Sequence, residues 1–157
     1  MDTKVSFAFG DGEYTFWLPL PQVIELQRRC GLLDNEGKLH PQSILTIFDQ
    51  ISDGMGADGE GAVLWIGGGA ALPNECNEVL RLGLIGGNAG MVDGQEIAVG
   101  PHRAKELVDL YGYPARPLSE VMAYAYRVLH AAIVGIDVKK KSPAKRPTNR
   151  SRSTRAS

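Results

Sequence analysis

A single helical pattern, residues Arg116–Gly135, constrains the fold of this chain more than any other stretch. Pro117 suits the first turn of a helix, where a missing N–H costs nothing, and Glu120 complements the positive end of the helix dipole. Gly135 suits the position that ends a helix. Apolar residues recur at helical spacing, which places this helix at the centre of the expected core. The apolar stripe consists of Leu118, Val121, Met122, Ala125, Val128, Leu129, Ala132 and Ile133.

The composition of the chain changes just after this helix. Its other side carries Tyr124, Arg127 and His130, which predicts a solvent-facing surface. Residues 1–138 hold nine Lys and Arg against 18 Asp and Glu, so they carry a net charge of −9. Residues 139–157 hold eight Lys and Arg and no acidic residue. We therefore predict a folded acidic domain over 1–138 and a disordered tail over 139–157, since the tail has too little apolar surface to offset its chain entropy.

Composition also restricts the class of protein. An acidic domain is not typical of specific nucleic-acid binding, although the basic tail can bind polyanions weakly. Cys30 and Cys76 form neither a metal-binding spacing nor a disulfide framework, which favours buried free thiols. No charged leader precedes an apolar run, and no apolar stretch reaches the length of a membrane span. We expect a soluble, cytoplasmic protein that does not associate with membranes.

The first element is predicted to be a β-hairpin over Val5–Leu18. Asp11 and Gly12 suit the two central positions of a type I′ turn, which pairs Gly10 with Glu13. This register gathers apolar side chains on one face of the hairpin, namely Val5, Phe7, Phe9, Tyr14, Phe16 and Leu18. Trp17 falls on the opposite face, among small residues. It is either covered by another element or available to a partner.

The rest of the chain reads mainly as helices. A short helix follows Pro19, and further helices are predicted from Pro41, over Pro73–Ile85 and from Pro101. Their connections are expected to be a polar turn at Leu32–Leu39, a glycine-rich segment at Gly54–Leu72 and an irregular segment at Ala89–Gly100 with a turn at Asp93–Gly94. Within Gly54–Leu72, the apolar run Val63–Ile66 is a short strand or a buried loop. The predicted fold is α+β: an N-terminal hairpin packed on about five helices.

A search for catalytic chemistry finds no candidate constellation. His40, His102 and His130 have no partner at metal-ligand spacing and read as surface or cap residues. The glycine clusters at 67–69 and 83–90 do not follow the strand–loop–helix order of a phosphate site, and the second is entered from a helix. We therefore expect a protein that is not an enzyme and that carries no cofactor and no metal.

Several stretches together resemble a known family. The series RLGLIGGN, GMVDGQEIAVGP, AKELVDLY and RPLSEVMAYAYRVLHAAIVG, within Leu82–Gly135, resembles the gene transfer agent family of phage tail assembly chaperones. The N-terminal FAFGDGEYTFWLPLPQVIELQRRCG resembles the start of the same family. The resemblance implies a non-enzymatic protein of a prophage or gene transfer agent. It would bind tail tube protein subunits and help to load them on the tape measure protein.

Two other functions stay open at the level of sequence. One is a structural tail component, such as a tube or completion protein retained in the virion. The other is a nucleic-acid-associated protein that works through the basic tail. For a chaperone, which acts through protein–protein interaction, the aromatic and cationic side chains are the candidates for partner binding. These residues are Trp17, Trp65, Tyr113, Tyr124, Arg127 and His130.

Overall fold

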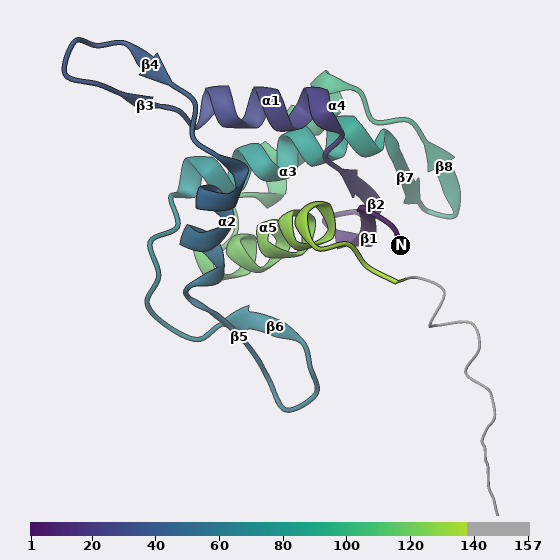
Figure 1. Cartoon of the computed structure of the whole chain (residues 1–157). Coiled ribbons are helices and arrows are strands. Elements are labelled where there is room, and N and C mark those ends of the chain that lie inside the picture. Colours follow the sequence, from purple (N-terminus) through teal and green to yellow (C-terminus); the bar gives the residue numbers. More distant parts are fainter. Residues whose placement is uncertain (138–157) are drawn as a thin grey trace, which may run out of the picture.

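The computed structural model describes residues 1–137, and the predicted basic tail at 139–157 lies outside the described residues (Figure 1). Within residues 1–137 the chain forms an α+β fold with five helices. The helices are α1 (Leu20–Arg29), α2 (Ile44–Ser52), α3 (Pro73–Gly87), α4 (Pro101–Tyr111) and α5 (Leu118–Ile133). The strands are β1 (Lys4–Phe9), β2 (Gly12–Trp17), β3 (Leu32–Leu33), β4 (Leu39–His40), β5 (Met55–Ala57), β6 (Val63–Trp65), β7 (Ala89–Val92) and β8 (Gln95–Ile97).

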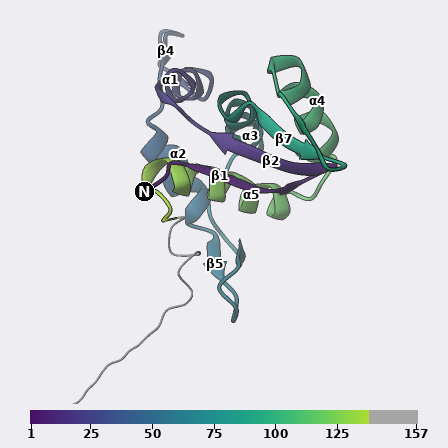
Figure 2. The same ribbon diagram turned by 90° about the vertical axis from the view of Figure 1, so that its right-hand side faces the viewer.

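A four-stranded antiparallel sheet with the order β1-β2-β7-β8 forms one layer of the fold. Helices α3 and α5 lie against one face of this sheet, and Figure 2 shows α5 running along β1. Alternation along the first two strands sends Phe7, Phe9, Tyr14 and Phe16 into the interface with the helices, where all four side chains are buried. The predicted apolar face of the hairpin is therefore confirmed.

The core is shared by two helices. The prediction placed Arg116–Gly135 at its centre, and α5 does bury Val121, Ala125, Val128 and Leu129. Helix α3 is equally central, because it packs on β2 and contacts α1, α4 and α5. Its glycines permit this position: a Cβ on Gly87 would overlap the carbonyl oxygen of Thr15. The second glycine cluster thus serves close helix–strand packing and helix termination.

The predicted register of the hairpin is wrong by two residues. Phe9 pairs with Gly12, so the turn residues are Gly10 and Asp11 rather than Asp11 and Gly12. Gly10 has a φ of +63°, and Asp11 does not adopt a positive φ, as in a type II′ turn with glycine first. A shift of two residues keeps every side chain on its face, which is why the predicted apolar face survives the error.

Two of the three connections differ from expectation. Ala89–Gly100 is not irregular, because β7 and β8 form a hairpin that joins the main sheet through β2. The turn predicted at Asp93–Gly94 is confirmed, and both residues have positive φ. Leu32–Leu39 carries a small β3–β4 ribbon rather than a simple turn. Gly54–Leu72 contains the β5–β6 ribbon, and the first of the two alternatives for Val63–Ile66, a short strand, is confirmed by β6.

The predicted polar side of α5 is also partly wrong. Tyr124 stacks on Phe7 with their ring centroids 5.4 Å apart, and it meets Phe9 edge-on at 5.3 Å. His130 stacks on Tyr126 at 5.6 Å and is half-buried. The sheet and α2 therefore cover part of the surface that helical periodicity had assigned to solvent, whereas Arg127 is exposed as predicted. Across residues 1–137, none of the helices combines the length and the apolar character needed to traverse a bilayer.

Candidate functional site

The six residues predicted to bind a partner do not form one site. Tyr124 and Arg127 lie together on the side of α5 that contacts β1, and His130 lies on the side facing α2. Trp17, Trp65 and Tyr113 lie on β2, on β6 and after α4. The structure therefore separates the candidates into one pair and four single positions.

The Trp17 ring lies on the face of the sheet opposite α3 and α5. Its Nε1 donates a hydrogen bond to Thr3 Oγ1 at 2.9 Å, and the Lys4 ammonium lies 4.8 Å from the ring centroid. The ring is half-buried by this N-terminal segment. The N-terminal segment thus covers the ring in part, and availability of the ring to a partner stays a prediction.

Trp65 and Tyr113 are more exposed. The Trp65 side chain is 43% exposed, and its Nε1 donates to the Gly68 carbonyl oxygen at 3.0 Å. Together with Leu118 and Met122 it lines a hollow of about 390 Å³ between the β5–β6 ribbon and α5. The Tyr113 backbone N–H donates to Asn77 Oδ1 at 3.1 Å, which fixes this loop against α3. Both side chains add to the accessible apolar surface.

Tyr124 and Arg127 form the outer layer of an aromatic stack on β1. Phe7 stacks on Phe16 at 4.5 Å and on Tyr124 at 5.4 Å, and the Arg127 guanidinium carbon lies 4.3 Å from the Phe7 ring centroid. Burial lowers the pKa of the Arg127 guanidinium, although the residue keeps an exposed surface. This pair is thus held rigidly at the edge of the sheet.

Strand β1 is an edge strand: among residues 1–137, β2 is its single neighbour in the sheet. The Phe9–Gly12 pair closes the hairpin and is a hydrogen-bonded pair, and hydrogen-bonded and non-hydrogen-bonded pairs alternate from there. Phe9, Phe7 and Val5 thus form the backbone hydrogen bonds to β2. The backbone groups of Lys4, Ser6 and Ala8 therefore point away from β2. The Lys4 N–H donates to Asp2 Oδ1 at 3.1 Å, which fits this orientation. Ser6 and Ala8 are exposed and leave a free backbone edge.

A hollow of about 290 Å³ lies at the turn end of this edge. One wall is β1 at Ala8–Gly10, and the aromatic walls are Tyr111 and Tyr124. Arg116 and Glu120 line the remaining side, joined by an ion pair of 2.8 Å between Nε and Oε2. The hollow is thus lined by apolar and aromatic side chains together with one neutralised charge pair.

The basic residues of the domain are mostly neutralised by neighbouring carboxylates. Six of its nine Lys and Arg form ion pairs, as Arg103 does with Asp11 at 2.9 Å. Within the described part of the chain, Lys4, Lys38 and Arg127 have no carboxylate within ion-pair distance. Two of these three, Lys4 and Arg127, lie along β1. Two of the three cations without a carboxylate partner therefore lie beside the free strand edge, and Lys38 lies on the β3–β4 ribbon.

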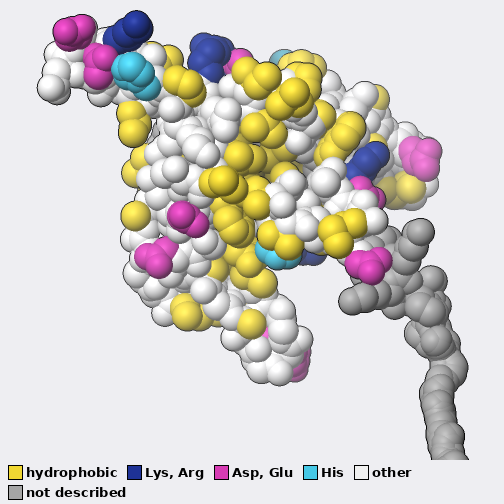
Figure 3. All heavy atoms as spheres, viewed as in Figure 1, with side chains coloured by type: hydrophobic (Ala, Val, Ile, Leu, Met, Phe, Trp, Pro, Cys, Tyr) yellow, Lys and Arg dark blue, Asp and Glu magenta, His cyan; other side chains and the backbone are white. Residues whose placement is uncertain are grey.

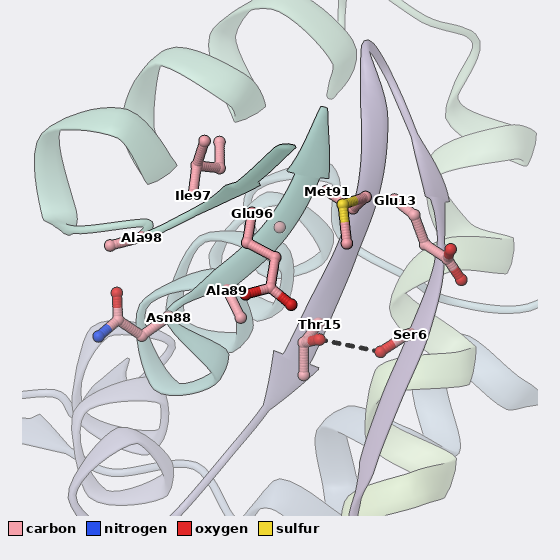
Figure 4. A pocket seen from close by; sticks show the side chains of 10 residues that line it. Ser6, Glu13, Thr15, Asn88, Ala89, Met91, Glu96, Ile97 and Ala98 are labelled. Carbon is pink, nitrogen blue, oxygen red and sulfur yellow. Dashed lines mark hydrogen bonds between the residues drawn. The ribbon is translucent and has the colours of Figure 1, made fainter. Parts of the chain in front are cut away.

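The open face of the main sheet is hollowed as well. This hollow measures about 610 Å³, and Figure 4 shows its lining side chains on β1, β2, β7 and β8. The Ser6 and Thr15 hydroxyls share a hydrogen bond of 2.9 Å, and Glu13, Met91 and Glu96 surround them. Neither a histidine nor a cysteine lines it, so its chemistry is that of a polar surface.

A buried polar cluster escaped sequence analysis. Glu75, at the start of α3, is 1% exposed, and its Oε2 accepts a hydrogen bond of 2.7 Å from Gln42 Nε2. Burial raises the pKa of Glu75, and the Gln42 hydrogen bond opposes that rise. Burial also raises the pKa of the free thiols Cys30 and Cys76 to about 12, so neither is a ready nucleophile. Gln42 and Glu75 lie 33 positions apart in the sequence, so hydrophobic periodicity gave no sign that they contact each other.

Metal binding has no support from side-chain grouping. Across residues 1–137, no three His, Cys, Asp or Glu side chains are placed to hold a metal ion. His40 instead forms a short contact with Asp34, 2.8 Å between Nε2 and Oδ2, on the β3–β4 ribbon. His102 is almost fully exposed on α4. Both residues occupy the kind of surface position that the sequence predicted.

Exposed apolar side chains gather on the two small ribbons. The β3–β4 and β5–β6 ribbons project from the body in Figure 1 and carry six exposed large apolar residues. These are Leu32, Leu33, Leu39, Leu64, Trp65 and Ile66. Figure 3 shows further hydrophobic side chains in a band from α1 across the region where α2 and α5 meet. The apolar surface therefore extends over one side of the molecule.

Comparison with known proteins found no relative: no protein family, no curated protein and no solved structure matches the chain. The functional assignment therefore depends on the residues and on the geometry described above.

Proposed function

We propose that this chain is a non-enzymatic tail assembly chaperone of a phage or gene transfer agent. It binds tail tube subunits in the host cytoplasm and helps to load them on the tape measure protein. The observation that carries the proposal is the pair of projecting ribbons with their exposed apolar side chains. The β3–β4 ribbon projects from the body, and the β5–β6 ribbon contacts α5 yet keeps Leu64, Trp65 and Ile66 exposed. Exposed apolar surface of this kind is typical of protein-binding sites.

The proposed task matches this surface physically. Tube subunits polymerise through strands and apolar patches, which must stay covered until assembly. A chaperone has to release its client, so a small interface of mixed polarity suits it better than an extensive apolar one. Exposed leucines next to the polar tip of the β3–β4 ribbon, with Asp34 and Lys38, supply that mixture. The sequence resemblance supplies the identity of the client.

Co-expression with a phage or gene transfer agent tail tube protein tests the proposal. We expect a soluble complex on size-exclusion chromatography with light scattering, where the tube protein alone polymerises. The double substitution Leu33→Ser and Ile66→Ser removes two side chains that are 70% and 67% exposed, and it should weaken the complex at least tenfold. Leu110→Ser, on α4 and 56% exposed, is the matched control and should leave the complex intact.

Purified particles separate this function from a structural one. A chaperone is absent from particles by mass spectrometry, whereas a tube or completion protein is present at a fixed copy number. Detection at a fixed copy number would overturn the proposal. A nucleic-acid role predicts steep, salt-dependent and sequence-independent DNA binding that disappears on removal of residues 139–157.

A further inference from the structure

We infer that the free edge of β1 and the adjoining side of α5 bind an extended segment of the partner as an added β-strand. The segment places a carboxylate against Arg127 and, two residues further along, an apolar side chain in the hollow beside Ala8–Gly10. This inference concerns a different surface from the projecting ribbons. It rests on the proposed function only for the identity of the partner, a tail tube subunit.

The backbone of β1 offers the main-chain part of this site. Ser6 and Ala8 direct their N–H and C=O groups outward, and both side chains are small. Six residues make β1 the longest edge available in the sheet, since β8 on the opposite side has three. Proline, a bulge or a covering loop commonly protects such an edge. In the described residues, β1 has none of these along Ser6–Ala8.

Helix α5 supplies a wall beside this edge. Glu120, Tyr124 and Arg127 lie four and three residues apart, so they share one side of the helix. Helix α5 runs antiparallel to β1: its beginning lines the hollow at Ala8–Gly10, and Ile136, just beyond its end, forms a β-bridge with Asp2. Alternate side chains of an added strand would therefore meet Glu120, Tyr124 and Arg127 in turn.

The side chains of α5 beside the β1 edge determine which side chains the bound partner segment should carry. Arg127 stacks on Phe7 and has no carboxylate partner among residues 1–137, so its remaining N–H groups suit an acidic side chain. Arg127 lies over Phe7, and the hollow lies beside Ala8–Gly10. The next side chain on the same face of the added strand, about 6–7 Å further along, would therefore reach the hollow. Its tyrosine walls and the Arg116–Glu120 pair suit an uncharged apolar side chain.

A second copy of this chain fits the same site poorly. Antiparallel pairing of two β1 strands would bring the helix-facing side chains of one copy, Val5, Phe7 and Phe9, toward Arg127 of the other copy. This row contains no carboxylate, and Phe7 and Phe9 are already buried in their own core. A heterologous strand that carries an acidic residue is therefore the better occupant.

Proline substitution tests the backbone component with the full chain. Proline at Ser6 removes an outward N–H and no backbone hydrogen bond to β2, and the side-chain hydrogen bond to Thr15 that it also removes is exposed, so the edge strand should tolerate it. Ser6→Pro should weaken binding of the tail tube subunit at least tenfold, measured by biolayer interferometry. The control is Glu96→Pro, an outward-facing position on the opposite edge strand β8 by the same alternation, which should bind normally. Melting temperatures establish that both variants are folded.

A peptide tests the side-chain component without any tail protein. The probe is the fluorescein-labelled peptide Ser-Thr-Glu-Thr-Phe-Thr-Ser, compared with the same peptide carrying glutamine in place of glutamate. Arg127→Gln should weaken binding of the glutamate peptide about tenfold and leave the glutamine peptide nearly unchanged, as measured by fluorescence anisotropy. Equal losses for both peptides, or no binding of either peptide to the unmodified chain, would overturn the inference.

The two assays distinguish failure of the inference from failure of the proposed function. If the tube subunit binds the unmodified chain and Ser6→Pro equally well, the edge is not the site, and the chaperone function stands. If the tube subunit does not bind, the proposed function fails, and the peptide assay alone decides whether the edge accepts a strand. A dimer of the unmodified chain that Ser6→Pro converts to a monomer would show that the edge pairs with itself, which would also overturn the inference. If Ser6→Pro does not fold, the Arg127→Gln result decides.

Discussion

The guanidinium carbon of Arg127 lies 4.3 Å from the centre of the Phe7 ring, which also stacks on Phe16 and Tyr124. A residue at the surface of α5 is therefore attached directly to the aromatic core of the hairpin. The contact joins the two parts of the chain that enclose the β1 edge. Stability of the hairpin and the geometry of the candidate site should consequently depend on the same aromatic side chains.

Truncation of these rings tests that dependence. Phe7→Ala and Phe16→Ala should each lower the free energy of unfolding by about 3–5 kcal/mol, because both side chains are buried and stacked. Trp17→Ala should cost less, since its ring is half-buried on the open face of the sheet. Urea unfolding followed by circular dichroism measures all three. A loss for Trp17→Ala as large as that for Phe7→Ala would place Trp17 in the core.

The glycines at the end of α3 predict a second set of stability effects. A Cβ on Gly86 or Gly87 would overlap the backbone carbonyl oxygen of Trp17 or Thr15, and neither backbone can move without shifting β2. Gly86→Ala and Gly87→Ala should each destabilise the fold by about 1–3 kcal/mol or more, despite the better helix propensity of alanine. Gly59→Ala, which meets no atom within 4 Å, is the matched control and should change stability by under about 0.5 kcal/mol.

The hairpin illustrates what the sequence could and could not determine. Alternation of apolar residues fixed the buried face, but Gly10-Asp11-Gly12 allows two turns that differ by two residues and keep the same face. The deciding contacts are remote. The Tyr111 ring packs against Gly10 where a Cβ would stand, and Arg103 bonds to the Asp11 carboxylate. Both partners lie on α4, so the local pattern contained no information about them.

The candidate site shows the same limit. Sequence periodicity assigned Tyr124 and Arg127 to solvent. Arg127 is exposed, but Tyr124 is partly covered by β1, because the packing of α5 beside β1 is a long-range contact. That β1 forms an edge depends on β7 pairing with β2 instead, through Glu13 and Met91, residues 78 positions apart. The helices were predictable because their caps and apolar stripes are local, whereas strand order in the sheet is not.

Asp11 should give a stability effect that disappears in acid. The Tyr14 hydroxyl donates to its carboxylate at 2.6 Å and, together with Arg103, lowers the pKa of Asp11 below its ordinary value of 3.8. The folded chain thus holds this proton less tightly than the unfolded chain. Asp11→Asn should cost about 1 kcal/mol or less at pH 7, and the difference from the unmodified chain should shrink as the pH falls below about 4. Denaturant unfolding at pH 7, 5 and 3 measures it. A constant difference over this range would contradict the assignment.

Glu75 should show the opposite dependence on pH. Its side chain is 1% exposed, Gln42 supplies one hydrogen bond, and Oε1 has no hydrogen-bond partner in the described residues. Burial raises the pKa of Glu75 above its ordinary value of 4.5, so the folded chain holds the proton more tightly than the unfolded chain. As the pH rises past 4.5, the unfolded chain releases this proton first, and the folded state loses stability until its own pKa is passed. Glu75→Gln keeps an acceptor for Gln42 without the charge, so it should be more stable than the unmodified chain at pH 7, with the gain disappearing near pH 4. Glu36→Gln, in an exposed turn, is the control for the same substitution at the surface. A Glu75→Gln protein that is less stable at pH 7 would mean that the folded state uses the charged carboxylate.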